Sequence, residues 1–180
     1  WKYCPELEII MKKETYLKMT QPFRENAKAG RALHITNKIF TYIVMASYPL
    51  LLLYLLFSRD ENLFRAIVVP LDSFIILSVF RYMVNRPRPY EKFNIRPAID
   101  KDTCGKSFPS RHVFSGFVIS MTFLYCMPQV FPWNITGWVL MAVSAVIAII
   151  RVISGVHYIS DVLVGALVGI ISGVVGFTII

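Results

Sequence analysis

Long stretches without any charged residue are the feature of this sequence that most restricts its fold. Residues 39–57 contain no Asp, Glu, Lys or Arg, and neither do residues 113–150. A helix needs about 20 apolar residues to cross the hydrocarbon core of a bilayer. Because the backbone in that core must satisfy its own hydrogen bonds, these stretches predict transmembrane α-helices.

We expect five such spans. The first two cover residues 39–57 and 63–84, with a polar turn between them. The stretch 113–150 is too long for one crossing, and Pro, Asn and Gly residues between positions 128 and 137 divide it into two spans. Residues 160–180 supply the last one. The sequence therefore predicts an all-α integral membrane protein, consistent with 56% hydrophobic and only 17% charged residues.

Residues 1–38 form a basic segment before the expected transmembrane domain, residues 39–180. Apolar side chains recur in this segment at loosely helical spacing, with lysines between them: Tyr3, Leu7, Ile10, Met11 and Leu17. This pattern is typical of an amphipathic helix on the membrane surface, and a solvated helix or arm fits it nearly as well. The chain begins at Trp1 rather than Met, so we expect a further segment upstream.

The chain carries 19 Lys and Arg against 11 Asp and Glu, a net charge of +8. In so apolar a protein this excess favours anionic headgroups or phosphates as partners, rather than nucleic acid. Cysteines stand at positions 4, 104 and 126 without the spacing of a zinc site, so we expect no structural metal.

In a bundle of five spans, four helix ends share one membrane surface: the second and fourth spans end there, and the third and fifth begin there. The most unusual polar residues of the chain stand at these ends: Arg81, Arg88, Ser110, His112, Arg151, His157 and Asp161. Residues that are distant in the sequence are therefore expected to form one site.

The cations at this surface suggest a phosphate ligand, because a guanidinium presents a planar fork of donors to phosphate oxygens. The arginines expected to serve this role are Arg81, Arg88, Arg111 and Arg151. Ser110 takes the N-cap position of a helix whose free N–H groups attract anions. Arg86 and Arg96 are interpreted as solvated loop residues.

The two histidines suggest catalysis. His157 and Asp161 are four residues apart, and therefore on one face of a helix that begins near them. A carboxylate that accepts from one ring nitrogen fixes the tautomer and leaves the other nitrogen free to attack. His112 lies on the facing helix, so one histidine can attack phosphorus while the other protonates the departing oxygen.

Three motifs at these helix ends make the chain resemble the type 2 phosphatidic acid phosphatase (PAP2) superfamily of membrane lipid phosphatases. The superfamily patterns are Lys-x6-Arg-Pro, Pro-Ser-Gly-His and Ser-Arg-x5-His-x3-Asp. This chain has RYMVNRPRP from Arg81, SFPSRH from Ser107 and RVISGVHYISD from Arg151, in the same order. The resemblance covers roughly residues 39–180, and the compact form is similar to bacterial undecaprenyl-diphosphate phosphatases.

The resemblance implies a role for each matching residue. His157 would form a phosphohistidine and be oriented by Asp161, while His112 would act first as general acid and then as the base that activates water. The phosphoryl oxygens would be bound by backbone N–H groups near His112 and by these side chains: Arg81, Arg88, Ser110 and Arg151. No metal or other cofactor is implied, because the arginines neutralise the charge.

Three positions depart from the superfamily patterns. Arg81 replaces the usual Lys, Ile150 replaces a Ser, and Arg111 replaces a Gly. Arg111 would stand beside the phosphate cradle, where it either clamps a second phosphate and favours a diphosphate substrate, or points to solvent. The sequence leaves both readings open.

A site at headgroup level suits a lipid whose tail stays in the bilayer, with water as the second substrate. Undecaprenyl diphosphate is the first candidate, followed by phosphatidate and phosphatidylglycerol phosphate. Two alternatives stay open: a lipid-headgroup phosphotransferase, and a non-catalytic protein that binds or transports lipid phosphates.

The distribution of charge and the family resemblance predict opposite sides of the membrane for the site. Seventeen basic residues fall on the site face and two on the other, which favours a cytoplasmic site by the positive-inside rule. The similar bacterial enzymes face outward, so we expect a site on the extracytoplasmic face of the cell membrane; a span before Trp1 would reverse the topology.

Three smaller features also yield expectations. Small residues on the last span serve tight packing within the chain or a homodimer contact: Gly165, Gly169 and Gly173. Cys4 and Cys104 belong to one face and are hypothesised to pair. Asp72 lies too far from Arg81 for catalysis, and it or Ser73 is expected to satisfy a backbone group freed by Pro70.

Overall fold

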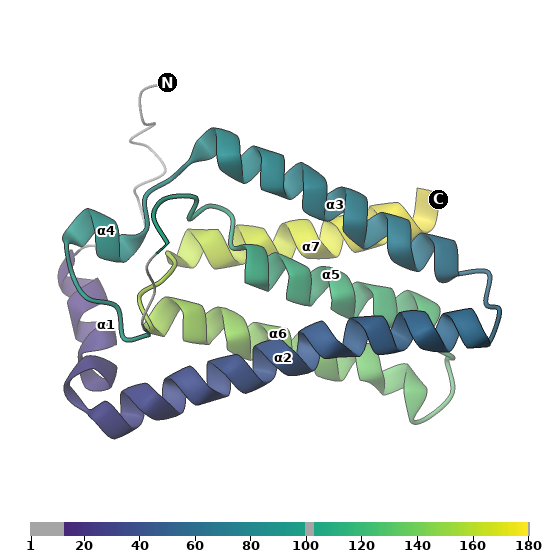
Figure 1. Ribbon diagram of the computed structural model, residues 1–180, viewed down its shortest axis with the longest axis horizontal. Helices are drawn as coiled ribbons and strands as arrows, with labels where there is room; N and C mark the ends of the chain where they lie inside the picture. Colours follow the sequence, from purple (N-terminus) through teal and green to yellow (C-terminus); the bar gives the residue numbers. More distant parts are fainter. Residues whose placement is uncertain (1–12, 100–102, 180) are drawn as a thin grey trace.

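The computed structural model describes residues 13–99 and 103–179, and every regular element in these two ranges is helical. The elements are α1 (Lys13–Glu25), α2 (Ala27–Phe57), α3 (Leu63–Val84), α4 (Pro89–Phe93), α5 (Arg111–Cys126), the 3₁₀ helix η2 (Trp133–Ile135), α6 (Thr136–Ile153) and α7 (Ile159–Ile179). Figure 1 shows the five long helices as a bundle with α1 and α4 at one end. The predicted all-α class is confirmed.

Within residues 13–99 and 103–179, four helical regions are long and apolar enough to span a membrane: α2, Leu63–Phe93 with α3, Trp133–Ile153 with α6, and α7. The remaining long helix, α5, has only 16 residues and is buried on nearly all sides. It packs most extensively against α6 and α7 and also contacts α2 and α3. The element expected as the third of five spans is therefore the central helix of the bundle, enclosed by its neighbours, and five spans are not confirmed.

α2 is longer than the span expected from its apolar run. It begins at Ala27, where Oδ1 of Asn26 accepts from the N–H groups of Lys28 (3.0 Å) and Ala29 (3.2 Å). At 1.5 Å per residue its 31 residues extend about 46 Å, whereas the hydrocarbon core is about 30 Å thick. The first turns of α2 therefore project beyond the membrane core at the end that carries α1.

Small residues allow α7 to approach α5 closely. A Cβ on Gly165 would lie 2.8 Å from the carbonyl oxygen of Ser110, and one on Gly169 would lie 2.9 Å from that of Phe114. Gly173 packs in the same way against the side chain of Met121. These three glycines serve packing between α5 and α7 within the chain, and a homodimer contact stays a prediction.

Pro70 interrupts the hydrogen bonding of α3, because it has no N–H to donate to the carbonyl of Ala66. The hydroxyl of Tyr48 in α2 donates to that carbonyl at 2.9 Å. Ser73 instead bonds a carbonyl within its own helix, and Asp72 is exposed. The compensation for Pro70 thus comes from a neighbouring helix, and the expectation that Asp72 or Ser73 provides it is wrong.

The ends of α3 and α6 and the beginnings of α5 and α7 lie at the end of the bundle that carries α1 and α4 (Figure 1). α1 is attached there through Tyr16, which is fully buried and donates its hydroxyl to the carbonyl of Gly155 at 2.8 Å. Gly155 has a φ of +78°, and a Cβ there would meet the Tyr16 hydroxyl. α1 thus holds the turn between α6 and α7.

Candidate active site

A small cavity of about 60 Å³ opens at this end of the bundle. Its lining residues come from helix ends and loops far apart in the sequence: Arg81, Arg88, Thr103, Arg111, His112, Arg151 and His157. All but Thr103 are residues predicted from the sequence. The other two predicted residues, Ser110 and Asp161, are fully buried and joined by a backbone hydrogen bond of 2.8 Å from the N–H of Ser110.

His157 and Asp161 form a buried pair at the start of α7. His157 precedes the helix and Asp161 lies in its first turn. Nδ1 of His157 is 3.3 Å from Oδ2 of Asp161, and the same oxygen accepts from the N–H of Tyr158 at 3.1 Å. The helix N-terminus favours a negative charge at this position. The carboxylate is therefore placed to orient the imidazole with its proton on Nδ1.

Two further residues, which the sequence motifs do not point to, complete this pair. Ser107 donates its hydroxyl to Oδ2 of Asp161 and lies 3.4 Å from Nδ1 of His157. Arg86 donates from Nη1 to Oδ1 of Asp161 at 2.8 Å, with its guanidinium 4.2 Å from the centroid of the Tyr158 ring. The interpretation of Arg86 as a solvated loop residue is wrong, because it is the cation that compensates the buried carboxylate.

Burial determines the charge of His157. It lowers the pKa of this ring from 6.5 to about 4, because the cation loses its hydration. The hydrogen bond and charge of Asp161 offset part of this effect, while Arg88 and Arg151 lower the pKa further. His157 is therefore neutral near pH 7, as a nucleophile has to be.

Two buried side chains at the site have polar atoms without a hydrogen-bond partner in the described ranges: Oγ of Ser110 and Nε of Arg151. Ser110 occupies the N-cap of α5, but its side chain makes no capping hydrogen bond. Leaving a buried donor without a partner costs free energy. Both atoms are thus available to a ligand that offers acceptor oxygens, as a phosphate does.

Backbone carbonyls fix the other two buried arginines. Arg81, in the last turn of α3, donates to the carbonyls of residues 106 and 107. Arg88 donates from Nε to Gly105 at 3.2 Å and from Nη1 to Val156 at 3.5 Å. Each guanidinium is anchored on one side while its residue still lines the cavity, so the positive charge is preorganised.

Arg111 and His112 occupy the first turn of α5, where backbone N–H groups have no partner within the helix. His112 is half-buried and lines the same cavity as His157. Arg111 is exposed, with its guanidinium 5.7 Å from the ring centroid of Phe74 in α3, and it also lines the cavity. It is therefore a cation at the solvent side of the site.

The remaining expectations concern residues beside the site. Cys104 is exposed and adjacent to Thr103, which lines the cavity. Its hypothesised partner, Cys4, lies outside the described residues, and so does the proposed disulfide. Arg96 lines a second cavity, at the junction of α1 and α2.

Comparison with known proteins relates the chain to a protein family. The sequence profile of the PAP2 superfamily matches residues 62–180. The bacitracin transport permease protein BcrC of Bacillus licheniformis is 29% identical over 116 residues, which cover 62% of this chain and 54% of that protein. The chain thus spans about half the length of this relative.

Two crystal structures share the fold. LpxE of Aquifex aeolicus superposes with a TM-score of 0.65 at 22% identity, over 85% of this chain and 94% of that one. The first transmembrane PAP2-type phosphatidylglycerolphosphate phosphatase from Bacillus subtilis superposes with a TM-score of 0.69 at 16% identity, over 91% and 83%. Because the superfamily profile covers most of the chain and all three motif segments, this multi-pass membrane protein belongs to the PAP2 superfamily.

Proposed function

We propose that this chain is a lipid phosphatase that works at the membrane surface without a metal ion. The observation that carries the proposal is the buried His157–Asp161 pair, 3.3 Å apart, beside a cavity lined by three buried arginines. A neutral, oriented imidazole is a nucleophile. Arginines can supply the positive charge that phosphoryl transfer requires.

In the first step, Nε2 of His157 attacks phosphorus as the bond between phosphorus and the lipid oxygen breaks. His112 gives its proton to that oxygen. Nδ1–H of His157 stays hydrogen-bonded to Asp161, whose negative charge stabilises the ring as it becomes positive. The products are a phosphohistidine and a lipid alcohol, or a lipid monophosphate when the substrate is a diphosphate.

In the second step, His112, now neutral, accepts a proton from water as the water oxygen attacks the phosphohistidine. The phosphorus–nitrogen bond breaks, its electron pair returns to Nε2 of His157, and inorganic phosphate leaves. Donors hold the phosphoryl oxygens in both steps, and we assign this role to Arg81, Arg88, Ser110 and Arg151, together with the first N–H groups of α5.

Undecaprenyl diphosphate remains the first candidate substrate. Arg111 supports this choice, because a cation at the exposed side of the cavity is placed to bind a second phosphate. Phosphatidate and phosphatidylglycerol phosphate come next, and the second of these is supported by the name of the Bacillus subtilis structure.

A non-catalytic protein that binds or transports lipid phosphates is a second candidate, favoured by the name of the Bacillus licheniformis permease. Such a protein would use the arginines but would have no need of a buried nucleophile with its own carboxylate.

We also propose that α5 completes five spans, that α1 lies on the membrane surface, and that the site faces outward.

Phosphate release from detergent-purified protein in the presence of EDTA tests the proposed activity, with undecaprenyl diphosphate, phosphatidate and phosphatidylglycerol phosphate as substrates. We expect release from at least one lipid and its loss in His157→Ala. His34→Ala is the matched control, because His34 is exposed on α2 outside the cavity. Retained release in His157→Ala would overturn the mechanism, and lipid binding without release by the wild type would favour transport.

A further inference from the structure

Arg86 binds the oxygen of Asp161 that does not contact His157. Its side chain is only 11% exposed, and its Nη1 donates to Oδ1 of Asp161 at 2.8 Å and to Oγ of Ser160 at 2.9 Å. The other oxygen of the carboxylate, Oδ2, is 3.3 Å from Nδ1 of His157. Arg86 does not line the catalytic cavity, so its guanidinium contacts the carboxylate and not the place of a bound phosphate.

Contacts from two other segments hold Arg86 in this position. Its guanidinium lies 4.2 Å from the ring centroid of Tyr158 and 5.9 Å from that of Phe108, as cations do over aromatic rings. The carbonyl of Arg86 accepts from the N–H of Ser107 at 2.8 Å, and the Ser107 hydroxyl donates to Oδ2 of Asp161. Arg86 thus binds one carboxylate oxygen directly and positions a donor to the other.

The charge of Arg86 is important because the cluster is buried. Asp161 is fully buried and His157 is 2% exposed, so a carboxylate without a compensating cation would be costly here. With Arg86 in place, one cation balances one carboxylate and the imidazole can stay neutral. Without Arg86, a second proton on the imidazole would restore the balance and would occupy the lone pair that attacks phosphorus.

Other charged and titratable groups face His157 from the elements around the cavity. They come from α3, the N-terminus of α4, the first turn of α5 and the last turn of α6: Arg81, Arg88, Arg111, His112 and Arg151. The arginines among them disfavour a second proton on His157, with or without Arg86. Arg86 differs from them because it bonds to Asp161, so its loss acts through the carboxylate.

We propose that Arg86 is a positioning residue for the imidazole of His157: it holds and compensates the Asp161 carboxylate, which then orients the ring without drawing a second proton onto it. This inference rests on the proposed function, because it concerns the same nucleophile. It places a determinant of the reaction behind the residues that line the cavity, in the segment between Arg81 and Arg88.

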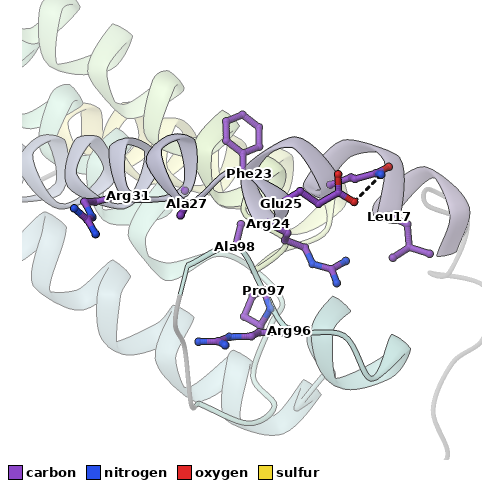
Figure 2. A pocket seen from close by; sticks show the side chains of 11 residues that line it. Leu17, Phe23, Arg24, Glu25, Ala27, Arg31, Arg96, Pro97 and Ala98 are labelled. Carbon is purple, nitrogen blue, oxygen red and sulfur yellow. Dashed lines mark hydrogen bonds between the residues drawn. The ribbon is translucent and has the colours of Figure 1, made fainter.

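The protonation of His157 is measured without substrate, by nuclear magnetic resonance of detergent-purified protein that carries ¹⁵N-labelled histidine. The chain has three histidines, and spectra of His34→Ala and His112→Ala identify the signals of the third. Arg86→Gln removes the charge, and Arg86→Lys keeps the charge without the planar fork. Arg31→Gln is the matched control, because Arg31 is an exposed arginine of α2 (Figure 2) that does not line the catalytic cavity.

Because burial lowers the pKa of His157 to about 4, the ring should be neutral throughout pH 5–8 in the wild type and in Arg31→Gln. In Arg86→Gln, the midpoint of its protonation should rise by about one pH unit or more, and the acid limb of phosphoenzyme formation should rise with it. Arg86→Lys should keep the wild-type midpoint. An unchanged midpoint in folded Arg86→Gln would overturn the proposal even if its activity is lower, since a contact that only supports the fold does not move the midpoint.

A thermal melt establishes that each variant folds. If Arg86→Gln does not fold, Arg86→Lys decides: kcat should fall about 3-fold with unchanged KM, because an ammonium lacks the planar group that lies against Tyr158, and a wild-type kcat would overturn the proposal. If the wild type forms no phosphoenzyme, the proposed function fails, while the titration of the histidine signals still decides whether Arg86 controls the charge of His157.

Discussion

The carboxylate of Asp161 is fully buried and yet makes four polar contacts. Oδ2 contacts the Ser107 hydroxyl, the Tyr158 N–H and Nδ1 of His157, while Oδ1 accepts from Arg86. A buried charge is tolerated only where such partners replace water. Because every contact also fixes its direction, the carboxylate holds the imidazole of His157 in one orientation.

Ser107→Ala tests this arrangement at a residue outside the three motif patterns. Loss of the hydroxyl removes a donor to Asp161 and a contact with His157, so we expect kcat to fall about 10-fold with little change in KM, since orientation and not substrate binding is lost. Steady-state phosphate release measures both constants. Ser120→Ala is the control, because that buried hydroxyl donates within α5, to the carbonyl of Gly116. Wild-type kinetics in Ser107→Ala would show that the contact does not position the nucleophile.

The lowered pKa of His157 predicts the acid side of the pH–rate profile. The ring has to be neutral to attack, and burial keeps it neutral down to about pH 4. Formation of the phosphoenzyme should therefore persist through pH 5–6, where an unperturbed histidine is largely cationic, and fall near pH 4. Single-turnover labelling of the enzyme across this pH range measures the rate of phosphoenzyme formation. An acid limb near pH 6.5 would contradict the lowered pKa.

The long helices can be predicted because transmembrane spans appear in the sequence as uncharged runs. The order of these spans then determines which helix ends share one membrane surface. The same reasoning brought Arg81, Arg151 and His157 to one surface, and the structure places them in one cavity. The start of α2 was not predictable in this way, because the Asn26 cap lies upstream of the apolar run. The fold of residues 85–99 and 103–110 depends on tertiary contacts, and the sequence there has no periodicity to interpret.

The role of Arg86 can be predicted from the need of Asp161 for a counter-ion. A carboxylate assigned to a buried site requires a counter-ion. Two arginines flank Pro87, and only Arg88 was assigned to the site, as a phosphate ligand, so Arg86 was the neighbouring candidate. No comparable rule points to Ser107, because a serine three residues before Ser110 has no sequence spacing that relates it to Asp161.

α1 is expected to influence catalysis through one hydrogen bond. Tyr16→Phe keeps the packing of the ring but leaves the carbonyl of Gly155, two residues before His157, without its donor. We expect kcat to fall about 3- to 10-fold because the turn is less firmly held. Tyr48→Phe is the matched control, since the hydroxyl of Tyr48 also donates to a backbone carbonyl, that of the buried residue Ala66 in α3, away from the site.

Thermal melts and phosphate release separate the two effects. Both variants should lose a similar amount of stability, about 1 kcal/mol for one hydrogen bond, whereas only Tyr16→Phe should lose activity. Equal activity in the two variants would mean that α1 contributes to stability without positioning His157.

At the scale of the whole molecule, the distribution of charge still opposes the proposed outward-facing site. Of the seventeen basic residues on the site face, five line the candidate active site or pair with its carboxylate: Arg81, Arg86, Arg88, Arg111 and Arg151. Twelve remain, against two on the other face. The positive-inside rule counts the Lys and Arg residues of short loops near the ends of the spans. The site arginines are present for their contacts, but the residues that remain still favour a cytoplasmic face by this rule, so the orientation has to be measured directly.

Cys104 provides a direct test of orientation, because it is exposed beside the catalytic cavity. In a Cys4→Ser/Cys126→Ser background, a membrane-impermeant maleimide should label Cys104 in intact cells if the site faces outward. Ser58→Cys, in a chain that lacks the other cysteines, places a thiol in the exposed turn between α2 and α3 at the other end of the bundle. That thiol should be labelled only after the membrane is permeabilised. The reverse pattern would place the site in the cytoplasm, and the basic residues would then be setting the topology as the positive-inside rule predicts.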